Sequence, residues 1–374
     1  TYTTIRNTVQ PGTGAIIGQS ISDLNTYWGF EDKGINALAK LTPGGPFEYV
    51  VGYDFQQYSG KDDVLLIAEQ EEEVNAVFGQ LRSTDDFIKN GSIALGVRHN
   101  EAGGSSKTIW NVSGRYDFTS WLYAQANAGT SFLLPTAEQL YAIDPFSTLG
   151  NPNIEAEEAE NLNFGVGGQL EAGPSLTWQA TYFTRDIDNR IQFADCDASD
   201  PNTNCAVLYP NLDSSYFNEG FYINLPGTVE VRGCELVGTA DFKNGFTAIA
   251  SYTDAKSNVE GGAQLVRVPR NYGKLGASYD ADAWGADMSV LWVGNVENQV
   301  AGFGRLPYGD YVVADIAAHL FLDADHKHKL TARVENMFDE QYRTALGSAL
   351  VDGSTTQRFQ VGTLGVPRTL HVTY

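Results

Sequence analysis

The chain has 374 residues, and its 24 Lys and Arg against 46 Asp and Glu give a formal net charge of −22 at pH 7. This charge argues strongly against a nucleic-acid partner, because binding to phosphates depends on clustered cations. The 42% hydrophobic and 12% aromatic content excludes a disordered acidic tail. The 39 Gly, 19 Tyr and 19 Phe favour strands and turns over helices.

The hydrophobic period along the chain is two. Between Leu122 and Phe132 the even-numbered residues are mostly apolar and the odd-numbered residues mostly polar, which predicts a two-sided strand. The same alternation predicts sixteen strands, at 1–9, 34–42, 46–58, 73–84, 87–99, 107–118, 120–134, 160–171, 176–190, 228–242, 245–257, 268–280, 286–298, 311–323, 328–342 and 367–374. Soluble sandwiches also alternate, so the period alone does not fix the architecture.

The connections between the predicted strands alternate in length. Tight turns are predicted at 172–175, 243–244 and 324–327, and long loops at 135–159, 191–227 and 343–366. A soluble sandwich has no physical reason to sort its loops by side, whereas an outer-membrane barrel has short turns at one end and long loops at the other. The sequence therefore predicts an all-β fold, a transmembrane antiparallel β-barrel.

The last predicted strand ends on an aromatic residue. Leu370, Val372 and Tyr374 alternate with Thr369 and two further polar residues, His371 and Thr373. This pattern resembles the C-terminal strand through which outer-membrane barrels are recognised for assembly. An ordinary terminal strand would show the same alternation.

Several segments keep the order and spacing of a known family. Ser131–Tyr141, Gly150–Ile154 and Glu157–Gly165 resemble the strand end, external loop and returning strand of TonB-dependent outer-membrane receptors. Weaker matches follow at Val231–Glu235, Val268–Asn271, Val334–Tyr342 and Gly365–Thr369. The chain departs from the family in lacking its usual Arg before Pro135 and in having Ala156 in place of a frequent Pro. The resemblance covers roughly residues 120–374.

The resemblance implies a barrel of about 22 strands around a plug domain that carries a TonB box. Because only sixteen strands are predicted, we expect residues 1–374 to be barrel domain, with the plug, the TonB box and the first strands missing. A fragment and a truncated gene product both fit this expectation. The implied partners are the TonB complex, outer-membrane lipid and a small-molecule ligand, and the implied location is the outer membrane of a Gram-negative bacterium.

The resemblance also implies transport rather than catalysis. The implied function is TonB-dependent uptake of a scarce ligand, most often an iron–siderophore complex, without a cofactor of the protein's own. Cobalamin, haem or an oligosaccharide are alternative ligands. A passive porin of sixteen strands and a soluble β-sandwich, either a binding module or a carbohydrate-active enzyme, are the alternative classes.

Two cysteines lie in the predicted loop 191–227. Cys196 and Cys205 are expected to form a disulfide, because an oxidising compartment permits one and a loop of this size is easily closed. A metal site built from these cysteines with neighbouring aspartates has no recognised ligand spacing, so no metal is expected. Cys234 is left unpaired on a predicted strand.

Ligand contacts are expected from aromatic and arginine side chains in the long loops, since both suit chelates and anionic ligands. The candidates are Phe146, Tyr209, Tyr216, Phe217, Tyr222, Arg343 and Arg358. Aromatic residues also form the interfacial girdles of barrels, which is the structural alternative for the tyrosines and phenylalanines. The acidic run from Glu69 to Glu73 is interpreted as an exposed loop. No catalytic residue is predicted.

Overall fold

The computed structural model describes residues 2–9, 16–63, 65–103, 105–144, 148–194, 196, 204–211, 220–259, 262–300, 302–351 and 357–374. These residues form 25 strands and two short helices, α1 (Ala137–Tyr141) and α2 (Cys205–Leu208). Within this part of the chain, no helix has the length and apolar character needed to cross a membrane. The prediction of an all-β fold is confirmed.

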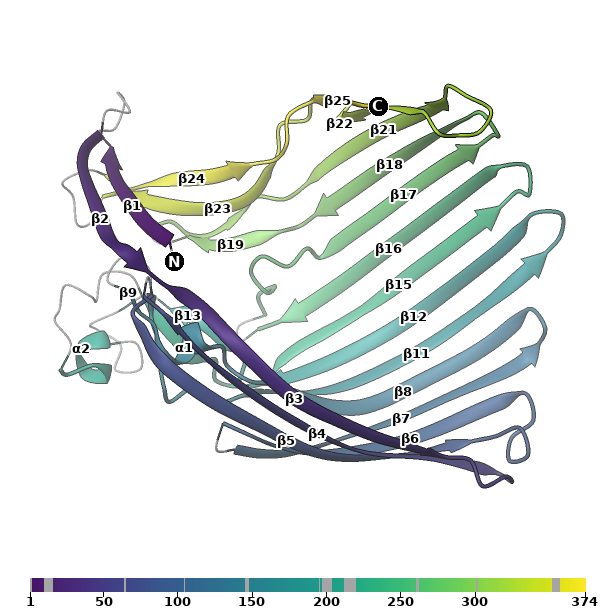
Figure 1. Cartoon of the computed structure of the whole chain (residues 1–374), viewed down its shortest axis with the longest axis horizontal. Coiled ribbons are helices and arrows are strands. Elements are labelled where there is room, and N and C mark those ends of the chain that lie inside the picture. Colours follow the sequence, from purple (N-terminus) through teal and green to yellow (C-terminus); the bar gives the residue numbers. More distant parts are fainter. Residues whose placement is uncertain are drawn as a thin grey trace. The chain divides into compact units, whose positions relative to one another are not determined.

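The largest sheet contains fifteen strands, hydrogen-bonded in the order β3-β4-β5-β6-β7-β8-β11-β12-β15-β16-β17-β18-β21-β22-β25 (Figure 1). Their bounds are β3 Trp28–Leu41, β4 Phe47–Asp62, β5 Ile67–Ser83, β6 Gly91–Ala102, β7 Ser105–Thr119, β8 Leu122–Leu133, β11 Glu157–Glu171, β12 Ser175–Asp188, β15 Val229–Asp241, β16 Phe246–Asn258, β17 Asn271–Asp280, β18 Trp284–Gly294, β21 Tyr311–Phe321, β22 Lys329–Glu335 and β25 Thr369–Thr373. The pairings within β3–β6 and within β15–β25 are antiparallel.

Fifteen of the predicted strands correspond to these fifteen. The remaining prediction, 1–9, matches β1 (Tyr2–Val9), but β1 pairs with β2 (Ile16–Thr26) in a separate two-stranded sheet. The strand predicted at 328–342 ends at Glu335, because Asn336 adopts a left-handed backbone with φ of 47°. Asn336 is one of the residue types that tolerate this conformation.

The chain divides into two compact units, which we describe separately. Unit 1 comprises residues 1–113, 128–161 and 186–229, and unit 2 comprises residues 114–127, 162–185 and 230–374.

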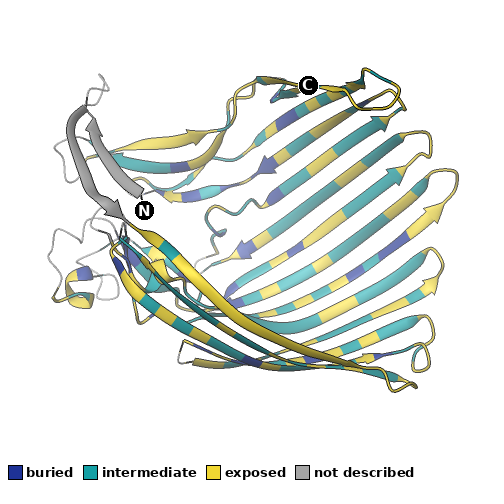
Figure 2. Ribbon diagram, viewed as in Figure 1, coloured by how far each residue is buried: buried dark blue, intermediate teal, exposed yellow. Residues whose placement is uncertain are grey.

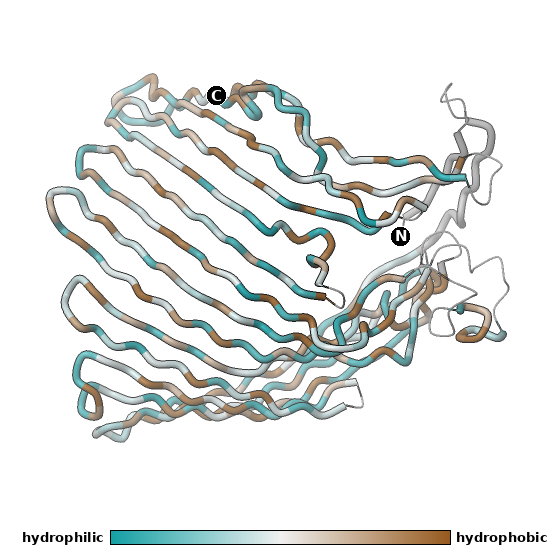
Figure 3. The backbone as a smooth tube through the Cα atoms, turned by 180° about the vertical axis from the view of Figure 1, so that it is seen from behind, coloured by the Kyte–Doolittle hydropathy of each residue, from teal (hydrophilic) through white to brown (hydrophobic). Residues whose placement is uncertain are grey.

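In unit 1 the strands separate polar from apolar side chains. Asn36, Asp54 and Asn100 share one face, where Asn36 and Arg98 both bond to Asp54. The opposite face carries exposed apolar side chains, at Val51, Tyr53, Val77, Leu95 and Val97. The alternation of hydropathy along each strand is visible in Figure 3, and Figure 2 shows how much of each strand remains exposed. Such a band of exposed apolar side chains is the pattern of a lipid-facing surface.

The acidic run is not a loop. Residues Glu69–Glu73 belong to β5, where Glu72 pairs with Tyr58 and Glu73 with Gln57 of β4. The interpretation as an exposed loop was wrong because β4 and β5 continue as a paired hairpin beyond the apolar band. A strand in that position presents polar side chains on both faces, so its sequence does not alternate in hydropathy.

Two long connections of unit 1 fold together into a small body, the loop lobe. It contains α1, α2 and a four-stranded sheet of order β13-β14-β10-β9, with β9 Ile143–Asp144, β10 Thr148–Leu149, β13 Ile191–Ala194 and β14 Phe221–Asn224. Its core consists of Leu149, Cys205 and Phe221, with Tyr209 and Ile223 packed against them. The described parts of the predicted loops 135–159 and 191–227 therefore contain regular secondary structure.

In unit 2 the long connections contain hairpins. β19 (Glu297–Val300) pairs with β20 (Gly304–Pro307), and β23 (Arg343–Leu350) pairs with β24 (Arg358–Leu364). The Asn298 side-chain amide donates to the Leu346 carbonyl, which joins the two hairpins. The predicted loop 343–366 thus contains β23 and β24.

The C-terminal strand β25 pairs with β22 in unit 2. Leu370 lies opposite Val334 and Val372 opposite Ala332, and Leu370, Val372 and Tyr374 are all exposed. The predicted alternation is present, since these three large side chains are exposed, although the Tyr374 ring also stacks on His328. Their role in barrel assembly stays a prediction.

Candidate functional site

A cavity of about 1330 Å³ lies within unit 1. One wall is formed by the ends of β3, β4 and β5 that lie beyond the apolar band. A second part of the lining is formed by α1 and the segments around it, residues 134–141 and 152–156. Pockets that hold drug-sized ligands measure about 300–1,000 Å³, so this cavity is large enough for a bigger molecule.

The sequence fixes α1 in place through local hydrogen bonds. Thr136 caps the helix by accepting from the Gln139 backbone N–H at 3.3 Å, and the Gln139 side chain accepts from the Thr136 N–H at 2.9 Å. This reciprocal pair is a capping box. At the C-terminal end of the helix, the Gly150 N–H donates a hydrogen bond to the carbonyl of the C-cap residue Ala142 at 2.6 Å.

The Gly-Asn pair after the helix has two separate structural roles. A side chain at Gly150 would place its Cβ 2.5 Å from the Tyr141 backbone nitrogen, so only glycine fits. The Asn151 side-chain amide donates to the Tyr222 carbonyl at 2.8 Å and thereby ties the two long connections of the loop lobe together. The motif Gly150–Ile154 therefore positions a wall of the cavity.

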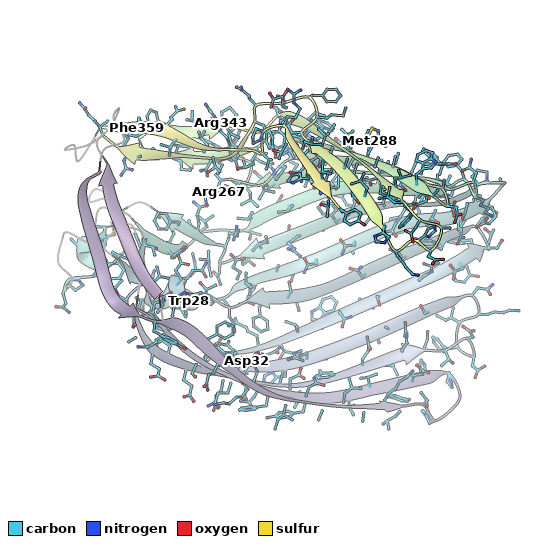
Figure 4. All side chains as sticks on the ribbon, turned by 45° about the horizontal axis from the view of Figure 1, so that its top comes forward. Trp28, Asp32, Arg267, Met288, Arg343 and Phe359 are labelled. Atoms are coloured by element: carbon cyan, nitrogen blue, oxygen red, sulfur yellow. A yellow bond between two sulfur atoms is a disulfide. The ribbon has the colours of Figure 1, made fainter. Side chains whose placement is uncertain are left out.

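The strand wall carries a row of polar side chains. Asp32, Tyr58 and Glu72 lie directly opposite one another on β3, β4 and β5 (Asp32 is labelled in Figure 4). Asp32 accepts from the Gln56 amide at 2.9 Å, and Glu72 accepts from the Tyr58 hydroxyl. Burial raises the pKa of the Glu72 carboxyl above its ordinary value, against the lowering effect of the Tyr58 hydrogen bond. Burial, and then the neighbouring Glu72, raise the pKa of Tyr58.

The wall formed by α1 and its neighbours combines one carboxylate with apolar side chains. Glu138 of α1 accepts from the Tyr222 hydroxyl at 3.2 Å. The apolar part consists of Leu134, Pro135, Leu140, Tyr141, Pro152 and Ile154. A ligand in this cavity would therefore meet acceptor oxygens on two sides and an apolar surface beside them.

The predicted ligand residues fall in different places. Tyr209 is not a cavity residue, because its hydroxyl donates to the Gly150 carbonyl at 2.7 Å and its ring packs edge-on against Phe221. Burial raises the pKa of Tyr209 to about 12. Tyr222 lies beside the cavity through its bond to Glu138. Phe146, Tyr216 and Phe217 lie outside the described residues.

The two candidate arginines belong to unit 2. Arg343 begins β23 and Arg358 begins β24, where the Arg358 side chain packs against Gly302. Sequence reasoning missed Asp32, Glu72 and Glu138 of the cavity. The signal that could have found Glu72 is the register of the β4–β5 hairpin, which places one of the consecutive glutamates on the inner face.

The cysteines of the long connection are joined in the structure. Cys196 and Cys205 form a disulfide with Cα atoms 5.4 Å apart, next to the core of the loop lobe. Cys234 is a free and exposed thiol on β15. Across the described residues, no group of three or more His, Cys, Asp and Glu side chains could hold a metal ion. The aspartates near the disulfide, Asp195, Asp197 and Asp200, lie outside the described residues.

Comparison with known proteins gives consistent results. The chain is 30% identical over 307 residues to the vitamin B12 transporter BtuB of Photobacterium profundum, covering 81% of this chain and 45% of that transporter. It is 22% identical to BtuB of Vibrio vulnificus over 64% of this chain and 34% of that protein. The chain thus spans less than half the length of these curated relatives.

The structure resembles that of the ferric enterobactin receptor PfeA from Pseudomonas aeruginosa. The TM-score is 0.69, and the match covers 99% of this chain and 57% of that receptor at 16% sequence identity. At this identity the likeness shows the fold alone. Residues 1–337 match the family described as TonB dependent receptor-like, beta-barrel. The chain therefore belongs to the TonB-dependent receptor-like β-barrel family, whose members are outer-membrane receptors and transporters.

Proposed function

We propose that this chain is the barrel part of an outer-membrane receptor that captures a scarce ligand and takes it up with energy supplied through TonB. The supporting observation is the family match over residues 1–337, together with a cavity large enough for a ligand bigger than a typical drug molecule. The family match favours a receptor over a passive porin.

A corrinoid of the vitamin B12 type is the first candidate ligand. It is favoured by the 30% identity to a vitamin B12 transporter, which covers 81% of this chain. A ferric siderophore is the second candidate, favoured by the sequence resemblance and by the fold shared with the ferric enterobactin receptor. In both cases the long loops would capture the ligand, and the TonB complex would act through a plug domain.

Uptake assays on the native gene test this proposal. Deleting the gene should abolish accumulation of either radiolabelled cyanocobalamin or a radiolabelled ferric siderophore, and deleting tonB should have the same effect. Reintroducing the full-length gene is the control. Accumulation that continues without TonB would favour a porin and contradict the proposal.

A further inference from the structure

The most distinctive feature of the cavity in unit 1 is its charge. We propose that this cavity selects a neutral or cationic ligand with hydrogen-bond donors on its surface, and that Asp32, Glu72 and Glu138 discriminate against polyanionic ligands. This inference rests on the proposed uptake function and specifies the chemical class of the ligand.

Among the residues that the structure describes, the three carboxylates have neutral hydrogen-bond partners. Asp32 accepts from an amide of Gln56, Glu72 from the hydroxyl of Tyr58, and Glu138 from the hydroxyl of Tyr222. A neutral donor satisfies an oxygen but leaves the negative charge uncompensated. The side chains that meet the ligand therefore carry net negative charge.

The two cations among the cavity residues are already paired. The Lys61 ammonium lies 3.3 Å from Asp63, and Lys107 is paired with Glu158. The Lys61 ammonium also lies over the ring of Tyr27, the residue that precedes the neighbouring strand β3. An anionic ligand would have to break one of these pairs to gain a counter-charge.

The arrangement of Asp32 and Glu72 on either side of Tyr58 lets their charges act on a ligand together. Asp32 and Glu72 lie on opposite sides of Tyr58, two strand spacings apart, which is about 10 Å. Because Glu138 lines the same cavity, a molecule that fills the cavity lies near all three charges. At an effective dielectric constant of about 20–40, one such charge at about 8 Å changes the binding energy of a unit charge by about 1–2 kcal/mol, or roughly tenfold in affinity.

The remaining surface restricts the ligand further. Carboxylates accept hydrogen bonds and cannot donate them, so the ligand must provide amide, hydroxyl or ammonium donors. Leu140, Tyr141 and Ile154 provide an apolar surface beside them. A large molecule with peripheral amides and an apolar side, or a ferric chelate with a free ammonium group, fits both requirements. A ferric tris-catecholate, which is a trianion, does not.

Binding of three probes to the purified full-length receptor tests this inference. The probes are neutral cyanocobalamin, a ferric trihydroxamate that bears one ammonium group, and trianionic ferric enterobactin. We expect the neutral or the cationic probe to bind at least about tenfold more tightly than the anionic one. In Asp32→Asn/Glu72→Gln/Glu138→Gln this preference should fall by about tenfold or more.

The matched control is Glu69→Gln, which removes a carboxylate from the same strand at a position that does not line the cavity. It should leave the preference within about twofold of wild type. If the triple variant does not fold, the salt dependence of the wild-type receptor replaces it: added salt should weaken binding of the cationic probe and strengthen that of the anionic one.

Two results would overturn the inference while leaving the uptake function intact. One is tighter binding of ferric enterobactin than of the other two probes. The other is an unchanged preference in a folded triple variant. If none of the three probes binds the full-length receptor, the proposed function fails as well, and the inference fails with it.

Discussion

The two units stabilise the segments that connect their strands in different ways. In unit 1 the loop lobe has an apolar core of Leu149, Cys205 and Phe221 beside a disulfide. In unit 2 the connections combine buried apolar side chains, such as Val300 and Leu346, with buried amides, such as Asn298 and Asn336. An apolar core tolerates imprecise geometry, whereas a buried amide stabilises only when its hydrogen bonds are complete. Substitutions in the two units should therefore differ in how strongly they destabilise the protein and in how many segments they affect.

The largest effect is expected for Phe221→Ala in the loop lobe. Phe221 is completely buried, so its truncation should destabilise the lobe by about 3–5 kcal/mol. Hydrogen exchange should show lost protection throughout β10, β13 and β14, because they share this core. Val207→Ala on α2, at an exposed position, serves as the control and should change little. Unchanged exchange in Phe221→Ala would show that the lobe does not depend on its core.

A smaller and more local effect is expected for Asn336→Ala in unit 2. The Asn336 amide donates to the carbonyls of Glu340 and Val366, both at 2.9 Å, and its oxygen accepts from the Glu340 N–H at 2.8 Å. Losing these bonds leaves backbone groups unpaired and should cost about 2–4 kcal/mol.

Hydrogen exchange around residues 336–342 and 365–368 would measure this loss. Asn336→Asp keeps the acceptor but places a carboxylate oxygen beside the Glu340 and Val366 carbonyls, so it should destabilise this segment at least as much as Ala. A variant Asn336→Asp as stable as wild type would contradict this prediction.

Reducing the disulfide should have the next largest effect. Cys196 and Cys205 close a loop with a sequence separation of 9, for which chain entropy gives about 2–3 kcal/mol. The lobe should become more susceptible to proteolysis in Cys196→Ala and in reductant. Cys234→Ser removes the free thiol on β15 and should behave as wild type. Equal proteolysis with and without reductant would contradict this prediction.

High pH should destabilise the loop lobe through Tyr209. The unfolded lobe releases the phenol proton near pH 10, whereas the folded lobe retains it up to its raised pKa of about 12. Stability is therefore complete below pH 10 and falls as the pH rises towards 12. Tyr209→Phe should lose about 1 kcal/mol at neutral pH, from its bond to Gly150, but should show a weaker alkaline loss. Tyrosine fluorescence and proteolysis across this pH range would measure both effects.

The sequence predicted the regular part of the molecule well. A strand such as Leu122–Phe132 lies between polar surroundings on one face and apolar surroundings on the other, so its residues record both faces. The β4–β5 hairpin beyond the apolar band lacks that contrast, and Glu69–Glu73 were misread for this reason. The cavity was missed because Asp32 and Glu138 line it together only through the folding of a loop distant in sequence, and a period of two contains no information about such long-range arrangements.

The smallest effect is expected for the two candidate arginines of unit 2. Their positive charge contrasts with the negative charge of the cavity in unit 1. Arg343 and Arg358 were predicted to contact a chelate or an anionic ligand, whereas the cavity in unit 1 is lined by carboxylates. If the ligand is neutral or cationic, Arg343→Gln and Arg358→Gln should change the affinity for cyanocobalamin by less than about twofold, since charges outside the binding cavity contribute little to affinity. Equilibrium binding to the full-length receptor measures this, with Glu72→Gln as the contrasting variant. A tenfold loss in either arginine variant would instead make the arginines part of the binding site, and the ligand would then need an anionic group as well as donors.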